Sequence, residues 1–348
     1  MFRGHTASIT HLALSADGKT LVSADSSNDI KVWATDPAEE ANVLTHDGIV
    51  VYAAISPDGE ILATSDPNFL TVRLWNLRTR SATPFITNGK AQVVFSPDGK
   101  WLAVGRFSGS VELWDRSSMP YRKAQVIEGF LAIGYHLNFS PDSRILAFRA
   151  PGNLVELWDV AAQRSIGRLP NHSSSECGTA FSSDGELIAT GSDSQVRIWH
   201  VHSQRLLAAI AGQSSEIRSV CFSRDASMLA AASGNAEVRR WNISDPEHPQ
   251  PLPPLRGHTA FVPQIAFSPD GKTLATASYD STVRLWNAAL GEEVATLRGH
   301  SSVVQCLTWS ADGRAIFTGS GDATVRIWRA PSWEEISAAE EKEKAELK

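Results

Sequence analysis

Residues 256–286 read RGHTAFVPQIAFSPDGKTLATASYDSTVRLW, and residues 298–328 read RGHSSVVQCLTWSADGRAIFTGSGDATVRIW. Each stretch opens with Arg-Gly-His, passes through an apolar segment and a Ser-x-Asp-Gly turn, and closes with an alternating run that ends in tryptophan. Six earlier stretches follow the same pattern, so the chain holds eight repeats, spaced 39 to 45 residues apart and ending at Trp33, Trp75, Trp114, Trp158, Trp199, Trp241, Trp286 and Trp328. Self-similarity at this period indicates an array of one supersecondary unit.

Each repeat predicts four short strands. The first is apolar and ends at the Ser-x-Asp-Gly turn, where glycine supplies a positive φ. In the seventh repeat, residues 273–278 form the second strand, residues 283–286 the alternating, half-buried third, and residues 292–297 a weaker fourth. Four antiparallel strands at this period predict the blades of a propeller.

Length and charge limit the class of protein. A chain of 348 residues is longer than one hydrophobic core usually serves, but in a repeat array each unit packs only on its neighbours. The net charge of −6 argues against a protein that follows a nucleic-acid backbone, because such a protein needs a basic face. No apolar run approaches the ~18 residues of a membrane-spanning helix. We therefore expect neither nucleic acid nor membrane as a partner.

The three cysteines, Cys177, Cys221 and Cys306, all fall in the apolar segment before a Ser-x-Asp turn. We interpret them as small buried hydrophobic side chains. Their odd number argues against a disulfide framework, and no pair has the spacing of metal ligands. A reducing, cytoplasmic location fits this usage.

The repeats resemble those of the WD-repeat (WD40) β-propeller family, whose signature is Gly-His at the start and Trp-Asp at the end of a unit. The resemblance covers residues 2–338, although Trp-Asp itself occurs only at Trp114-Asp115 and Trp158-Asp159. It implies an all-β, eight-bladed β-propeller of four-stranded antiparallel blades. The chain also looks like bacterial modules of many such repeats, some of which are joined to protein kinases or signalling ATPases.

The family resemblance implies a hydrogen-bonded set of His, Ser or Thr, Asp and Trp inside many blades. A buried indole needs an acceptor, and an aspartate can orient the histidine that bonds the hydroxyl. Carried onto the matching positions, the complete sets are His258, Thr276, Asp280 and Trp286; His300, Thr318, Asp322 and Trp328; and His172, Thr190, Asp193 and Trp199. We interpret these sets as structural.

Some repeats depart from this set. The first keeps His5 and Ser23 but has Ser27 at the aspartate position. The third and fourth lack the histidine, and Val104 and Phe148 replace the hydroxyl.

The closure of the ring also departs from the family pattern, in which an N-terminal strand commonly completes the last blade. Here only residues 1–3 precede the first Gly-His. Residues 329–338 align without a gap on residues 287–296 of the previous repeat. We therefore predict that the C-terminal segment supplies the outer strand of the last blade. The domain division is then a propeller over 1–338 and a charged tail or linker over 339–348. The abrupt start and this tail favour a module of a larger chain.

No motif of an enzyme is visible: there is no Gly-x-Ser-x-Gly elbow, no His-Glu-x-x-His and no phosphate-binding glycine loop. His200 and His202 can share one side of an extended segment, but no third ligand is in register. We expect no catalytic residue, cofactor or metal. The alternative left open is a propeller hydrolase or lyase, with a site at the channel mouth assembled from distant blades.

The resemblance also implies where a partner docks, on the face that carries the hairpins between second and third strands. Aromatic residues and arginine dominate binding hot spots. The candidate partner-binding residues at the matching positions are Arg106, Phe107, Tyr135, Arg218, Phe261 and Tyr279. A competing interpretation is that several of them plug the channel mouth. We expect a monomeric, non-catalytic scaffold that binds a protein or peptide, as the sensory or interaction module of a larger signalling protein.

Overall fold

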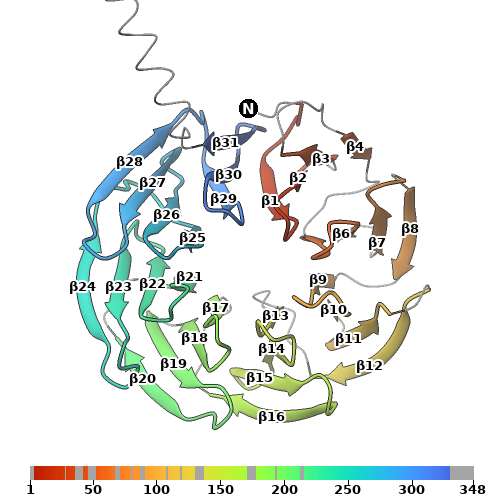
Figure 1. Ribbon diagram of the computed structural model, residues 1–348, viewed down its shortest axis with the longest axis horizontal. Helices are drawn as coiled ribbons and strands as arrows, with labels where there is room; N and C mark the ends of the chain where they lie inside the picture. Colours follow the sequence, from red (N-terminus) through yellow and green to blue (C-terminus); the bar gives the residue numbers. More distant parts are fainter. Residues whose placement is uncertain are drawn as a thin grey trace, which may run out of the picture.

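The computed structural model describes residues 4–27, 29–35, 42–45, 52–66, 71–79, 81–86, 91–106, 109–117, 120–129, 137–170, 178–192, 194–211 and 215–329. These residues form eight antiparallel sheets arranged in a ring, one sheet for each repeat, so the protein is an eight-bladed β-propeller (Figure 1). Seven blades have four strands and the eighth has three within the described residues. In the described part, no helix has the length and apolar character needed to cross a bilayer.

The strands follow one another outward from the centre in every blade. Blades one to three are β1 (Ile9–Leu14), β2 (Thr20–Asp25), β3 (Asp29–Ala34) and β4 (Asn42–Thr45); β5 (Tyr52–Ile55), β6 (Ile61–Asp66), β7 (Thr71–Asn76) and β8 (Ser81–Ile86); β9 (Ala91–Phe95), β10 (Trp101–Arg106), β11 (Ser110–Asp115) and β12 (Arg122–Glu128). Blades four and five are β13 (Leu137–Phe139), β14 (Ile145–Ala150), β15 (Leu154–Asp159) and β16 (Arg164–Leu169); β17 (Gly178–Phe181), β18 (Leu187–Ser192), β19 (Gln195–His200) and β20 (Leu206–Ile210). Blades six to eight are β21 (Ile217–Phe222), β22 (Met228–Ser233), β23 (Val238–Asn242) and β24 (Gln250–Leu255); β25 (Gln264–Phe267), β26 (Thr273–Ala277), β27 (Thr282–Asn287) and β28 (Glu293–Arg298); β29 (Val304–Trp309), β30 (Ala315–Ser320) and β31 (Val325–Arg329).

The burial of each strand explains its composition. Second strands lie between two neighbouring blades and are buried on both faces, as the fully buried Leu274, Ala275 and Ala277 of β26 illustrate. Small alanines at these positions let adjacent sheets approach closely. Outer strands such as β28 face solvent and carry mostly exposed or half-buried side chains.

The Ser-x-Asp-Gly turn between first and second strands is held by its own side chains. In blade seven the Ser268 hydroxyl donates to Asp270 at 2.6 Å and accepts the backbone N–H of Thr273 at 3.0 Å. Gly271 has a φ of +73°, which a residue without Cβ adopts without strain. Because these contacts are local, the same turn recurs at the corresponding place in each repeat.

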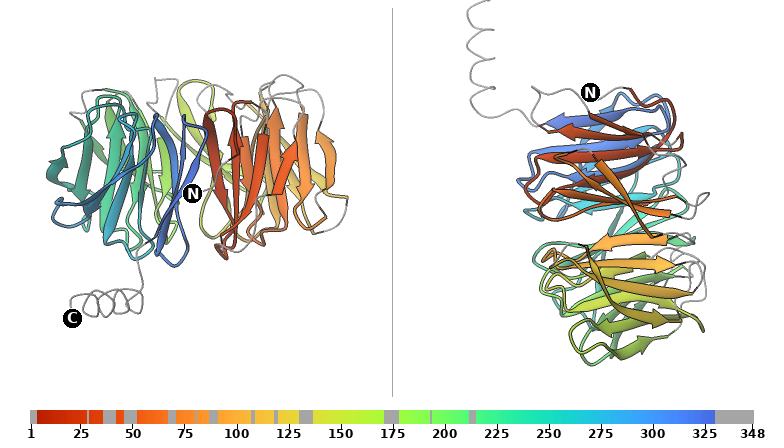
Figure 2. Two further views of the ribbon diagram at one scale, coloured as in Figure 1. Left: turned by 90° about the horizontal axis from the view of Figure 1, so that it is seen from above. Right: turned by 90° about the vertical axis from the view of Figure 1, so that its right-hand side faces the viewer.

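The first and last blades pack directly on each other, so the ring is closed (Figures 1 and 2). Ile9, Leu21 and Trp33 of blade one share a buried cluster with Phe317 and Val325 of blade eight. The rims meet through polar contacts as well, from Gln305 Nε2 to Ser8 Oγ at 2.7 Å and from the Arg329 guanidinium to the Thr35 carbonyl. The segment expected to add a fourth strand here, residues 333–338, and the tail 339–348 lie outside the described residues, so the strand and the domain boundary stay predictions.

Candidate functional site

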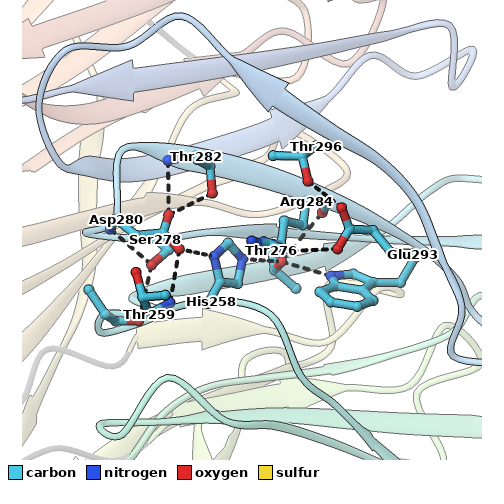
Figure 3. A network of polar contacts seen from close by, with 11 residues as sticks. His258, Thr259, Thr276, Ser278, Asp280, Thr282, Arg284, Glu293 and Thr296 are labelled. Carbon is cyan, nitrogen blue, oxygen red and sulfur yellow. Dashed lines mark hydrogen bonds and ion pairs between the residues drawn. The ribbon is translucent and has the colours of Figure 1, made fainter.

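The seventh blade holds a buried chain of hydrogen bonds that links the segment before β25 to β26, to the β26–β27 hairpin and to β27 (Figure 3). Trp286 Nε1 donates to Thr276 Oγ1 at 2.9 Å, and that oxygen lies 2.7 Å from His258 Nε2. His258 Nδ1 lies 2.8 Å from Asp280 Oδ2. Since a carboxylate only accepts, Nδ1 carries the proton, and Nε2 accepts the threonine hydroxyl. Every polar atom of the histidine ring is thereby engaged.

The electrostatics of this set keep the histidine neutral and the carboxylate ionised. Burial lowers the pKa of His258, although the Asp280 carboxylate opposes that shift. Burial on its own would raise the pKa of Asp280, but hydrogen bonds from Thr282 and His258 outweigh it and the pKa falls. The network extends outward, because Arg284 on β27 pairs with Glu293 on β28.

The eighth blade repeats the arrangement. His300 lies 2.8 Å from Thr318 Oγ1 and 2.9 Å from Asp322 Oδ2, and Trp328 Nε1 donates to the threonine at 2.9 Å. Hydrogen bonds from Thr324, the Ser301 N–H and His300 overcome burial and lower the pKa of Asp322 to about 2. In blade five Trp199 donates to Thr190 at 3.0 Å, while His172 and Asp193 lie outside the described residues.

In blade one, the carboxylate that bonds the histidine comes from a different position than the alignment of the repeats predicts. Ser27 occupies the matching sequence position, but the fully buried Asp25 lies 2.8 Å from His5 Nδ1. Ser27 instead donates its hydroxyl to Asp25 at 3.0 Å. Asp25 is the last residue of β2, two positions before Ser27, and its carboxylate still reaches the His5 ring. The alignment of the repeats did not identify Asp25. A search for an acidic residue within two positions of Ser27 would have found it.

Blade three replaces the histidine set with a buried glutamate. Glu112 on β11 accepts the indole N–H of Trp114 at 3.1 Å and lies 2.9 Å from Lys123 Nζ and 3.0 Å from Arg106 Nε. Glu112 was not predicted from the sequence, although the third and fourth repeats have glutamate at this position (Glu112 and Glu156) and the other six have arginine or lysine. Arg106 was expected to contact a partner, but its side chain is only 15% exposed and is held by Glu112.

Three of the other expected partner-binding residues come together where blades six and seven meet. The Arg218 guanidinium lies 5.5 Å from the centre of the Phe261 ring, and the Phe261 and Tyr279 rings meet edge to face at 5.0 Å. The Tyr279 N–H donates to the Phe261 carbonyl at 2.9 Å, which fixes the hairpin against the start of the first strand. Tyr279 is 42% exposed. These three residues are called the aromatic–arginine cluster below; Phe107 and Tyr135 lie outside the described residues.

Metal-type ligands gather at one place in the described part of the chain, where His5, Asp25 and Asp29 bring ligand atoms within 4.8 Å of one another. Both ring nitrogens of His5 are already hydrogen-bonded, to Asp25 and Ser23. Asp25 also accepts the Asp29 N–H at 3.0 Å. The group is therefore accounted for by the blade-one version of the hydrogen-bonded set.

His200 and His202 remain on the outer surface of blade five, with ring centres 6.3 Å apart. His200 lies 3.5 Å from Glu186 and 2.9 Å from the Ser203 hydroxyl. These are exposed contacts of a turn, and the described residues near them hold no enclosed arrangement of ligands.

Comparison with known proteins gives two family matches. Residues 1–242 match the family described as IFT122 first beta-propeller, and residues 249–287 and 291–329 match the WD domain, G-beta repeat. Similar proteins include the Target of rapamycin complex subunit wat1 of Schizosaccharomyces pombe, 33% identical over 102 residues, which are 27% of this chain and 32% of that protein. The human Apoptotic protease-activating factor 1 is 30% identical over 110 residues, which are 28% of this chain and 9% of that protein. The chain therefore matches about a third or less of the length of either relative.

Proposed function

The chain belongs to the WD-repeat β-propellers of the IFT122 first-propeller type, and from that membership we propose that it is a non-catalytic scaffold that binds a protein or peptide segment. The binding surface lies on the face that carries the hairpins between second and third strands. Its centre is the aromatic–arginine cluster of Arg218, Phe261 and Tyr279.

The observation that carries this proposal is an exposed aromatic group backed by a second ring and an arginine. Tyr279 presents its ring to solvent while Phe261 supports it edge to face. A supported aromatic surface binds with little loss of conformational freedom, and tyrosine and arginine are enriched at hot spots. A segment with an apolar anchor for Tyr279 and a carboxylate for Arg218 suits this chemistry.

The hydrogen-bonded sets support a non-catalytic role. In blades seven and eight the buried histidines bond to a hydroxyl and a carboxylate of their own blade. A general base needs access to a substrate proton, whereas the His258 and His300 side chains are only 1% exposed. They hold strands together.

The proposed cellular role of the chain is also that of a protein that binds other proteins. One relative is named as a subunit of a complex, which accords with a protein that acts by binding other proteins. We place this chain in the cytoplasm as a monomeric sensory or interaction module of a larger signalling protein. Its net charge of −6 accords with a protein partner rather than nucleic acid.

The test is selection of binding peptides from a displayed random library, followed by titration of the selected peptides against variants. The double variant Phe261→Ala/Tyr279→Ala is expected to weaken binding about thirtyfold or more, the loss typical of a hot spot. The matched control is Leu290→Ala/Val294→Ala, which removes two apolar side chains that are each 64% exposed on the outer rim of blade seven. Equal affinities of both variants and the unmodified protein would reject the site.

A further inference from the structure

Two of the three residues in the aromatic–arginine cluster lie on segments outside the strands. Phe261 belongs to the segment between β24 and β25, and Tyr279 to the hairpin between β26 and β27. The sheet ladder therefore does not fix the edge-to-face arrangement of the two rings. A side chain that must be ordered on binding reduces the affinity for a partner, so contacts that hold these segments in place contribute to binding.

Ser278 provides such a contact from inside the blade. Its side chain is fully buried, and it directly precedes Tyr279 in the hairpin. The hydroxyl donates to the carbonyl of Ala260 at 3.0 Å and accepts the backbone N–H of Asp280 at 3.1 Å. Since Ala260 directly precedes Phe261, one hydroxyl ties together the backbone next to both rings.

The Asp280 carboxylate, one residue after Tyr279, joins the same two segments (Figure 3). Its Oδ2 accepts the backbone N–H of Thr259 at 3.1 Å and lies 2.8 Å from His258 Nδ1. The Tyr279 N–H adds the bond to the Phe261 carbonyl at 2.9 Å. The buried hydrogen-bonded set therefore continues to the exposed face and fixes the backbone at both rings.

Blade eight builds the same frame without the aromatic rings. The buried Ser320 hydroxyl donates to the Ser302 carbonyl at 3.1 Å and accepts the N–H of Asp322 at 3.1 Å. The Gly321 N–H donates to the Val303 carbonyl at 2.8 Å, so these two residues stand where blade seven has its tyrosine and phenylalanine. The frame is common to both blades, whereas the rings are particular to blade seven, and blade eight therefore offers a matched control.

We propose that Ser278 is a positioning residue of the partner-binding surface: it holds Phe261 and Tyr279 in the arrangement that a partner segment binds, without touching that segment. Its hydroxyl is enclosed by the blade, so its effect on binding passes through the two backbone segments that it joins. This role rests on the proposed function and extends the binding site from its exposed rings to a buried residue of the same blade.

Titration of the library-selected peptides compares Ser278→Ala with Ser320→Ala. Each substitution removes a fully buried hydroxyl with the same two hydrogen bonds, so equal decreases in the urea midpoint are expected. Ser278→Ala is expected to weaken peptide binding about tenfold, because both rings must then be ordered on binding. Ser320→Ala is expected to leave the affinity within about twofold of that of the unmodified protein. Equal affinities of the two variants would overturn the positioning role.

The variant Phe261→Ala/Tyr279→Ala separates a failure of this role from a failure of the proposed function. If that variant weakens binding and Ser278→Ala binds as tightly as the unmodified protein, the positioning role is wrong and the binding surface stands. If it leaves binding unchanged, the surface itself is rejected, and the role of Ser278 with it.

A spectroscopic measurement tests the position of the ring without a peptide. The chain has four tyrosines, so incorporation of fluorotyrosine gives a simple fluorine NMR spectrum in which Tyr279→Phe identifies the Tyr279 signal. Ser278→Ala is expected to move this signal toward the shift of free fluorotyrosine and to narrow it, since a ring that is no longer held moves faster. Ser320→Ala is expected to leave the signal unchanged. An unchanged Tyr279 signal in Ser278→Ala would overturn the positioning role even if the affinity of that variant is reduced.

Discussion

At the scale of single residues, the blades share a requirement more than a sequence: the indole N–H and the ring nitrogens need partners inside the sheet. Blades seven and eight meet it with Asp280 and Asp322 on the hairpin. Blade one meets it with Asp25 at the end of a strand, where the carboxylate accepts two backbone N–H groups as well as bonding His5. A buried carboxylate with several donors is costly to remove, because each donor is left unsatisfied.

We expect Asp25→Ala to destabilise the protein by about 3 kcal/mol, since it removes the acceptor of the buried His5 ring and of two partly buried backbone N–H groups. Ser27→Ala, which deletes the group at the matching sequence position, is expected to cost only about 0.5 kcal/mol because Ser27 is exposed. Urea unfolding of both variants measures the difference. If Ser27→Ala lowers the free energy of unfolding more than Asp25→Ala does, then the hairpin residue Ser27, not Asp25, orients the histidine.

At the scale of elements, the sequence predicted best what local contacts determine. The Ser-x-Asp-Gly turns and the strands on either side were recognisable because the turn bonds join residues at most five positions apart. The acceptor of Trp114 was not predicted, although Glu112 lies only two residues away along the chain. Glu112 acquires its role from Arg106 and Lys123, which a sheet must first bring together. The aromatic–arginine cluster likewise depends on how blades six and seven meet, which a single repeat does not reveal.

Two turns between first and second strands lack the usual glycine and store strain. Ala226 has a φ of +54° and Ser143 a φ of +64°, in the left-handed region that side chains with a Cβ adopt at a cost. Ala226→Gly is therefore expected to raise the unfolding free energy by about 0.5–1 kcal/mol, measured by urea unfolding. Ala230→Gly, in the buried strand β22, is the control and is expected to destabilise. A loss of stability in Ala226→Gly would show that the turn is not strained.

At the scale of the whole molecule, buried titratable groups are spread around the ring and act in the same direction on acidification. Burial lowers the pKa of His258 and His300 and brings that of His11 down from 6.5 to about 4. Despite burial, hydrogen bonds lower the pKa of Asp25 and Asp322 to about 2. The unfolded chain therefore binds more protons than the folded ring throughout the acidic range.

The sign of the pH dependence follows from this excess. Above about pH 6.5 the neutral histidines contribute their full stabilisation, and it is lost as the pH falls from 6.5 toward the lower folded pKa values. The aspartates extend the loss from about pH 4 to about pH 2. For His11 alone, the shift corresponds to about 3 kcal/mol. Urea midpoints measured from pH 8 to pH 3 are expected to fall steadily below pH 6.5.

Substitution of single histidines separates burial from general charge effects. His11→Leu removes the group and is expected to flatten the decline between pH 6.5 and pH 4. His248→Ala is the control, because Asp245 raises the pKa of this exposed histidine, so its contribution is lost on raising the pH and opposes the trend. A decline of unchanged slope in His11→Leu would mean that the acid sensitivity of the ring arises elsewhere, in the carboxylates or in the general build-up of positive charge.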